Sequence, residues 1–243
     1  ESEDCLLPET SPCDDSEECT LLDQCDGDGV CTGTPAELIP LAQGGCDDGD
    51  PCTADSCLEG GSCDHVDDCP GVPVINEVDY DQPGTDTMEF VEVLNPGPSA
   101  VALDLFRLEL VNGADGTIYG TFSLDQGLPS RRLDAGKRLV IGSVGVIAAL
   151  PAGTRSIPLG TVTIQNGAPD GLRIVRKTGS VFVDGVHYEG TMPTVGEGGT
   201  APTDSGTGAL GLSRCPDGGD TNNNAVDFLL LPPTPGMVNA PCP

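Results

Sequence analysis

Cysteines are the residues whose number and spacing most restrict the chemistry of this chain. Ten of the twelve lie between Cys5 and Cys69, and eight of these form two sets of four, over 13–31 and 46–63, each opening with Cys-Asp-Asp. Structural zinc sites pair cysteines across two to four residues, whereas four or five residues separate successive cysteines here. Ten cysteines at this density predict disulfides formed in an oxidising compartment, and not a zinc site.

We expect five disulfides among these ten cysteines, most of them within a repeat, with Cys5 and Cys69 available as an outer bridge. The full pairing stays open because ten cysteines allow very many connectivities. Near the C-terminus, Cys215 and Cys242 predict a bridge that pins the tail to the preceding domain, with an intermolecular bond as the alternative. The cysteines expected to be bridged are Cys5, Cys13, Cys19, Cys25, Cys31, Cys46, Cys52, Cys57, Cys63, Cys69, Cys215 and Cys242.

Acidic residues near glycine turns are candidate calcium ligands. Two loops combine carboxylates with amides or backbone carbonyls, as a seven-coordinate oxygen cage requires. In the first they are Asp79, Asp81, Asp86 and Glu89, and in the second Asp217, Asp220, Asn222, Asn224 and Asp227. The repeats hold further aspartates, Asp14, Asp15, Asp26, Asp28, Asp47, Asp48 and Asp50, without the order of an EF-hand loop. Asp and Asn are also ordinary turn residues that bond their own backbone, so both interpretations stay open.

The chain offers little material for catalysis. His65 and His187 are the only histidines, and the cysteines are expected to be bridged, so a nucleophilic triad is not predicted. Glu89 and Glu92 stand three residues apart on one expected strand and point to opposite faces, which argues against that pair as a glycosidase site. No phosphate-binding glycine motif is present. We expect a protein that is not an enzyme, with calcium as its candidate cofactor.

Charge and composition narrow the partners. The 243 residues include 39 Asp and Glu against 10 Lys and Arg, a formal charge of −29 that repels nucleic acid and anionic lipid. No apolar run is long enough to span a membrane. Glu1 is therefore expected to be a mature N-terminus of a secreted protein, left after removal of a signal peptide.

The pattern of short β-rich runs predicts a mainly β protein of two domains, a Cys-rich module over 1–72 and a β-sandwich over 73–243. A helix is expected at 143–150, and Asp184–Gly185 is expected to form a two-residue hairpin turn. Residues 33–45, an apolar stretch between the repeats, are expected to be a packed connector or a strand offered to another molecule. Strands are expected at 73–80, 88–95, 105–112, 117–124, 137–142, 160–164, 172–177, 180–190 and 209–214.

A family resemblance supports this division. The segment VINEVDYDQPGTDTMEFVEVLNPG, residues 74–97, resembles the opening of a bacterial lamin-tail domain, which carries Asn-Glu on one strand and Glu-Phe-Val-Glu-x-x-Asn on the next. Segments at 105–116, 133–142, 164–175, 212–228 and 233–240 follow in the family's order. A departure is Phe106, near which the family usually has Trp or Tyr. The N-terminal part is similar to Cys-rich repeats of large secreted proteins of myxobacteria and relatives.

The resemblance implies an immunoglobulin-like β-sandwich beside a disulfide-rich module on a bacterial cell surface, in families that are usually binding or structural modules. We expect an extracellular structural protein whose partners are copies of itself or other surface proteins, joined head to tail into a filament or matrix. The Cys-rich arm or the 33–45 segment would supply the joint. The alternatives are a monomeric calcium-dependent adhesion or ligand-binding module, and an accessory domain of a secreted hydrolase.

Overall fold

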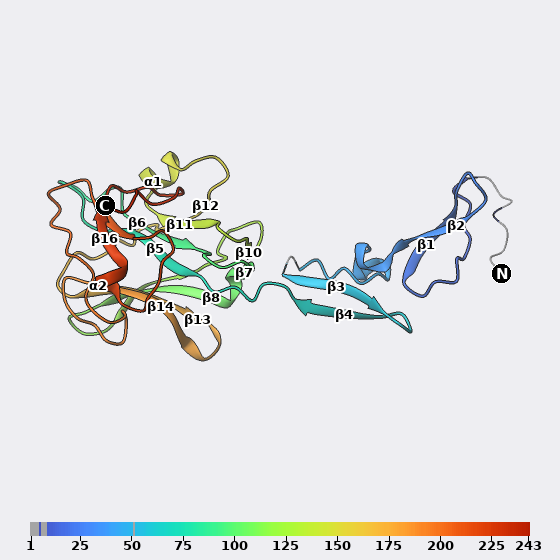
Figure 1. Ribbon diagram of the computed structural model, residues 1–243, viewed down its shortest axis with the longest axis horizontal. Helices are drawn as coiled ribbons and strands as arrows, with labels where there is room; N and C mark the ends of the chain where they lie inside the picture. Colours follow the sequence, from blue (N-terminus) through green and yellow to red (C-terminus); the bar gives the residue numbers. More distant parts are fainter. Residues whose placement is uncertain (1–4, 6–8, 51) are drawn as a thin grey trace. The chain divides into compact units, whose positions relative to one another are not determined.

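The computed structural model describes residues 5, 9–50 and 52–243, which fold as two compact units, Glu1–Asp68 and Cys69–Pro243 (Figure 1). The chain is mainly β in both units, as the sequence predicts.

Each cysteine repeat of the N-terminal unit is built on one antiparallel hairpin. The first pairs β1 (Thr20–Cys25) with β2 (Cys31–Pro35), and the second pairs β3 (Thr53–Leu58) with β4 (Ser62–Asp67). Two strands alone bury too little to be stable in water, so disulfides must supply much of the cohesion of this unit.

Each repeat has one internal disulfide, but two of the four disulfides whose pairing is described in this unit leave the repeat, so the prediction that most would lie within a repeat is wrong. Cys13–Cys31 and Cys46–Cys63 join the first cysteine of a repeat to its fourth, while Cys19–Cys57 joins the two repeats. Cys5 bonds Cys25, with Cα atoms 5.2 Å apart, so the predicted Cys5–Cys69 bridge is wrong. Cys52 and Cys69 are also disulfide-bonded. The bridge Cys215–Cys242 in the C-terminal unit confirms the prediction for the tail.

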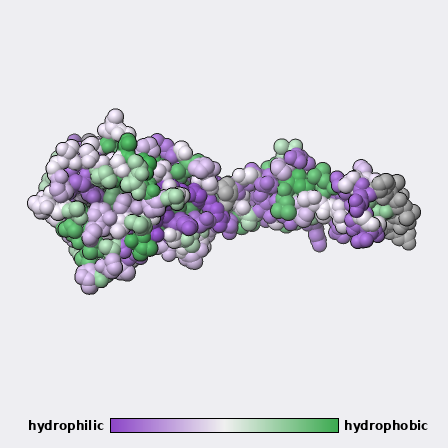
Figure 2. All heavy atoms as spheres, turned by 90° about the horizontal axis from the view of Figure 1, so that it is seen from above, coloured by the Kyte–Doolittle hydropathy of each residue, from purple (hydrophilic) through white to green (hydrophobic). Residues whose placement is uncertain are grey.

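The 33–45 segment begins in β2, which covers Cys31–Pro35, and then forms two 3-10 turns, η1 (Ala36–Leu38) and η2 (Leu41–Gln43). Residues 36–45 are therefore a connector, and a strand offered to another molecule stays a prediction for residues 33–35. Ala36 and Ile39 are buried, but Leu38 and Leu41 are 69% and 51% exposed. Figure 2 shows apolar side chains at the surface of the N-terminal unit.

The C-terminal unit contains two sheets packed face to face. The larger has the strand order β12-β11-β6-β5-β15-β16 and the smaller β14-β13-β8-β9. Residues from both sheets, such as Val91 and Leu139 of one and Leu108 and Leu172 of the other, share one buried core. This arrangement is the predicted sandwich. The strands are β5 Val74–Asp79, β6 Phe90–Leu94, β8 Phe106–Asn112, β9 Ile118–Ser123, β11 Arg138–Gly142, β12 Arg155–Pro158, β13 Asp170–Arg176, β14 Val181–Tyr188, β15 Gly211–Arg214 and β16 Phe228–Leu231.

Shorter elements complete the unit. The strands β7 (Val101–Ala102) and β10 (Arg132–Leu133) pair with each other, and η3 is Leu103–Leu105. The predicted helix is α1 (Val144–Ala149), whose first turn is capped by the Ser143 hydroxyl accepting from Val146 N–H. A one-turn helix, α2 (Asn224–Asp227), precedes β16.

Two local predictions are wrong. Residues 160–164 are not a strand; the neighbouring strand is β12, which pairs in parallel with β11. Asp184–Gly185 lies inside β14, after a bulge opposite Ile174, and not in a turn. Gly185 is needed there because a Cβ would lie 1.9 Å from the Val195 carbonyl oxygen. The turn between β13 and β14 is instead made by η4 (Thr178–Ser180).

Candidate functional site

Glu77, on β5, binds the C-terminal tail. Its Oε1 accepts hydrogen bonds from the Ser213 hydroxyl at 3.0 Å and from the Thr234 backbone N–H at 2.9 Å. Burial raises the pKa of Glu77 to about 7, and the negative charge of Glu92 adds to the rise. The carboxyl therefore has a structural partner on the tail and is costly to ionise.

Glu92, on the neighbouring β6, binds the same tail at a second point. Its Oε2 accepts from the Gly236 backbone N–H at 2.8 Å, and its Oε1 accepts from Asn76 at 2.9 Å and Arg138 at 3.0 Å. Burial raises the pKa of Glu92 to about 7, against the lowering effect of these donors.

Asn76 connects the tail to the sheet a third time. Its amide Nδ2 lies 3.1 Å from Asn239 Oδ1, and the Asn239 amide donates in turn to the Arg214 carbonyl. Asn76, Glu77 and Glu92, which we call the tail clasp, belong to the two sequences that carry the lamin-tail resemblance. These motif residues hold the chain's last segment on the sheet, beside the Cys215–Cys242 bridge.

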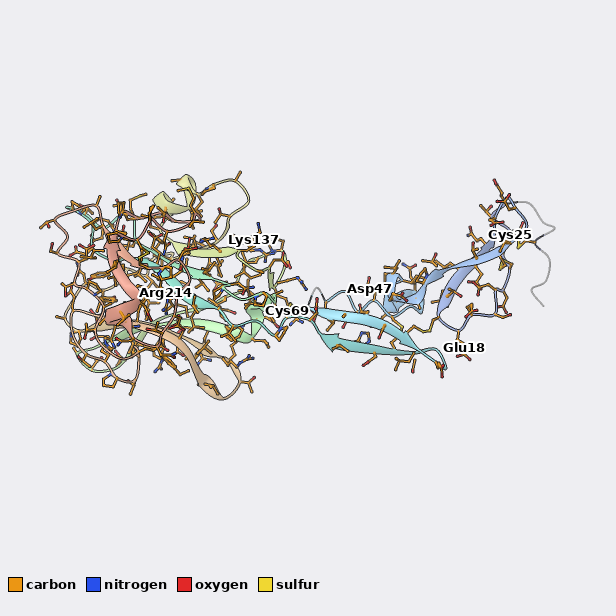
Figure 3. The ribbon with its side chains drawn as sticks, viewed as in Figure 1. Glu18, Cys25, Asp47, Cys69, Lys137 and Arg214 are labelled. Atoms are coloured by element: carbon orange, nitrogen blue, oxygen red, sulfur yellow. A yellow bond between two sulfur atoms is a disulfide. The ribbon has the colours of Figure 1, made fainter. Side chains whose placement is uncertain are left out.

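Arg214, on β15, is fully buried beside the second predicted metal loop (Figure 3). Its guanidinium donates to Asp184 at 2.7 Å, to Asp227 at 3.1 Å and to Asp220 at 3.2 Å. It also stacks over the Phe228 ring, 4.8 Å from the centroid. Arg214 thus supplies a positive charge to Asp220 and Asp227, two of the carboxylates for which the sequence predicted a calcium ion.

The remaining oxygens of that loop point to several partners. Asp217 is bound by Arg138 and Asn76; burial opposes its ionisation, but these hydrogen bonds lower its pKa. The buried Asn224 accepts at Oδ1 from the His187 and Glu197 backbone N–H groups and donates from Nδ2 to the Gly185 carbonyl. Asn222 is an exposed turn residue with a φ of 57°. The five residues predicted together therefore do not line one cavity.

The structure gathers a different set of carboxylates. Oxygens of Asp184, Glu197 and Asp220 lie within 4.8 Å of one another. Burial raises the pKa of Glu197 to about 8, and the charge of Asp184 adds to this. His187 is nearby in the chain and buried, and burial lowers its pKa, so it is neutral. Arg214 is bound to two of the three acids, Asp184 and Asp220.

The first predicted metal loop is organised by Gln82. Its side chain donates to Asp79 at 2.7 Å and accepts from Met88 N–H, and its backbone N–H donates to Asp86. Asp81 lies apart, within 3.4 Å of the Asn166 amide.

Glu89 accepts from the Ile164 N–H at 2.9 Å, and burial raises its pKa to about 7. Burial likewise raises the pKa of Asp79 to about 6. Asp86 and Glu89 open, with Asp170, onto a pocket of about 440 Å³. The structure thus brings part of this loop to one pocket.

Aspartates of the repeats form turns with their own backbone. Bonds of this kind, from the N–H two residues further on, are accepted by Asp14, Asp15, Asp26, Asp47, Asp48 and Asp50. His65 Nδ1 lies 2.6 Å from Asp55, whose hydrogen bond raises the pKa of the imidazole. This is the bonding expected of turn residues, and calcium at these positions stays a prediction.

Charge is divided unequally between the two units. Residues 1–68 contain 20 Asp and Glu and no Lys or Arg, whereas residues 69–243 contain 19 acids and all ten bases. Half of the bases fall in one stretch: Arg131, Arg132, Lys137, Arg138 and Arg155.

Three of these bases line a pocket of about 380 Å³. They are Lys137, Arg138 and Arg155; one carboxylate, Asp134, also lines the pocket, and Pro151 and Ala152 add apolar surface. Figure 3 shows Lys137 at the end of the C-terminal unit that also carries Cys69. Within the described residues, Lys137 and Arg155 have no carboxylate within ion-pair distance. The pocket is therefore a cationic site on a strongly acidic protein.

Comparison with known proteins gives no assignment: no protein-family model and no curated protein matches the chain. Among the described residues, no helix is long and apolar enough to cross a membrane.

Sequence reasoning missed Arg214, Gln82, Glu197 and the basic pocket. Arg214 carried a usable signal, because a single arginine in an apolar strand must be paired when buried. Nothing local marks Glu197, whose neighbours come from distant parts of the chain.

Proposed function

We propose that this chain is a non-catalytic structural protein of a bacterial cell surface, with a lamin-tail-like sandwich, that associates head to tail with copies of itself. The observation that carries the proposal is the division of charge: a unit with 20 acids and no base, and a second unit with half of the bases in one stretch. Complementary patches of this kind on one chain favour a heterologous contact, which extends into a filament unless it closes into a ring.

Ionic strength should affect such a contact in two directions. The total charge of −29 repels copies at long range, and at about 0.01 M salt this repulsion reaches roughly 30 Å. At about 0.15 M the screening length falls to about 8 Å, so long-range repulsion fades while touching charges still attract. At about 1 M the attraction is screened as well. We therefore expect assembly to be greatest at intermediate salt.

Other features agree with a structural role. The acidic residues of the tail clasp have hydrogen-bond partners on the tail, and so are engaged in holding the fold. Disulfides in both units suit an oxidising, extracellular setting.

Negative-stain electron microscopy and sedimentation velocity of the unreduced protein, at low, intermediate and high salt, test the proposal. Polymers that are longest at intermediate salt are the expected result. Uniform single particles at every salt and protein concentration would refute it. EDTA in a parallel series reports whether a divalent cation takes part in the joint.

A second candidate function is a monomeric, calcium-dependent binding module. The pocket that Asp86, Glu89 and Asp170 share favours it, because carboxylates around an open pocket can hold a calcium ion that also contacts a ligand. Isothermal titration with calcium distinguishes this function. Calcium binding that Glu89→Gln abolishes, with no change in the mass of the particle when calcium is added, would support it.

A further inference from the structure

The basic pocket is the best-defined candidate for the acceptor half of a head-to-tail contact. It combines the cations Lys137, Arg138 and Arg155 with the apolar surface of Pro151 and Ala152. Its one acid, Asp134, is paired with Arg132 at 2.8 Å. Arg138 is already bound to Glu92 and Asp217, so it contributes little free charge. Lys137 and Arg155 are the cations left to attract an incoming carboxylate.

The N-terminal unit presents a matching group. Leu38 is 69% exposed, more than any other large apolar residue of the described part of this unit. Glu37 precedes it and is exposed, and no residue that the structure describes forms an ion pair or a side-chain hydrogen bond with it. Ala36 and Ile39 are buried on either side of this pair, so the turn η1 is anchored and holds Glu37 and Leu38 outward.

We infer that the basic pocket is the acceptor for the Glu37–Leu38 turn of a second copy of this chain, an inference that rests on the proposed self-association. The carboxylate of Glu37 would lie between Lys137 and Arg155, and the Leu38 side chain would cover Pro151 and Ala152. The occupant is a second copy because every copy of the chain carries both the basic pocket and an acidic N-terminal unit. That unit contains no Lys or Arg that would repel the pocket.

Charge exchange tests the contact in the full chain. Lys137→Glu and Glu37→Lys each place like charges in the joint and should raise the protein concentration needed for assembly by at least about tenfold. The combined variant Glu37→Lys/Lys137→Glu restores opposite charges and should recover assembly. The matched control is Lys177→Glu, which makes the same change at an exposed lysine elsewhere in the C-terminal unit, where Lys177 pairs with Asp125 at 3.1 Å. It should assemble like the wild type.

Mixing adds a stricter readout. In an equimolar mixture of Lys137→Glu and Glu37→Lys, every contact between unlike variants places opposite charges at positions 37 and 137, so the mixture should form alternating polymers although neither variant assembles alone. Unchanged thermal unfolding, followed by tyrosine fluorescence and circular dichroism, confirms that the substitutions leave the fold intact.

The outcomes separate the two claims. If the wild type polymerises and Lys137→Glu polymerises equally well, the pocket is not the acceptor, and self-association stands. If the combined variant fails to recover while both single variants are blocked, Glu37 is not the group that meets Lys137. If the wild type is monomeric under every condition, both the joint and the proposed function are overturned.

Discussion

Replacing Glu77 by glutamine should remove a large part of the pH dependence of the stability of the C-terminal unit. Glu77 is fully buried in the tail clasp, and burial raises its pKa from 4.5 to about 7. The folded state therefore binds its proton more tightly than the unfolded state does. Stability from this group is complete below about pH 4.5 and is lost as the pH rises through about 7.

The magnitude follows from the shift. A rise of about 2.5 pKa units corresponds to about 3 kcal/mol of unfolding free energy, of which about 2.5 kcal/mol is lost between about pH 5 and pH 8. At a denaturant slope of about 2 kcal/mol per molar, this moves the urea midpoint by about 1 M. The pKa values of Glu92, Glu89 and Glu197 are raised too. The wild type should therefore lose more unfolding free energy between about pH 5 and pH 8 than Glu77 alone accounts for. The lowered pKa values of Asp217 and Asp227 act at more acidic pH, outside this window.

Tyrosine fluorescence is a suitable signal because the chain has no Trp and its three tyrosines, Tyr80, Tyr119 and Tyr188, all lie in the C-terminal unit. Urea unfolding at the two pH values, with the disulfides intact, gives the difference directly. Glu77→Gln keeps an acceptor for Ser213 and Thr234. Its unfolding free energy should change between about pH 5 and pH 8 by about 2.5 kcal/mol less than that of the wild type. The control Asp134→Asn removes an exposed carboxylate and should follow the wild type. An undiminished pH difference in Glu77→Gln would refute the assignment of the buried charge to this residue.

Three further predictions concern the stability of the same unit, each read from urea or thermal unfolding. Arg214→Met leaves Asp184 and Asp227 buried without their cation and should cost about 3–5 kcal/mol; a loss below about 1 kcal/mol would contradict the central place given to Arg214. Cys215→Ser/Cys242→Ser opens a loop with a sequence separation of 27 and should cost about 3.5 kcal/mol in chain entropy; unchanged stability would show that the tail clasp holds the tail unaided. EDTA should shift the melting temperature by less than about 2 °C, since arginines already neutralise the Asp217–Asp227 loop; a larger fall would favour the calcium interpretation.

Strands with a regular burial pattern could be predicted from the sequence. In β8, Phe106, Leu108 and Leu110 alternate with charged residues, and each of the three is fully buried. The strand β12 escaped prediction because it is four residues long, ends in Pro158 and pairs in parallel, so its burial depends on its neighbour β11 and not on its own pattern.

The charged site was harder to predict because its contacts are nonlocal. Asp184 followed by Gly185 is a strong local signal for a turn, yet the partner of Asp184 is Arg214, thirty residues further on. The acidic loops were recognised as acidic, but the sequence did not reveal that arginines and backbone amides already occupy most of their oxygens. Local composition identifies candidate ligands; only the fold decides which of them remain free.

The disulfide scheme of the repeats has a mechanical consequence. A pull on the ends of the segment between Cys19 and Cys57 is carried by the covalent bond between them, whose Cα atoms are 5.6 Å apart. The 38-residue separation they span, about 130 Å when fully extended, cannot be drawn out unless that bond is reduced. Tension would therefore pass through sulfur and leave unloaded the hydrogen bonds of the first hairpin, which lies inside this closed segment.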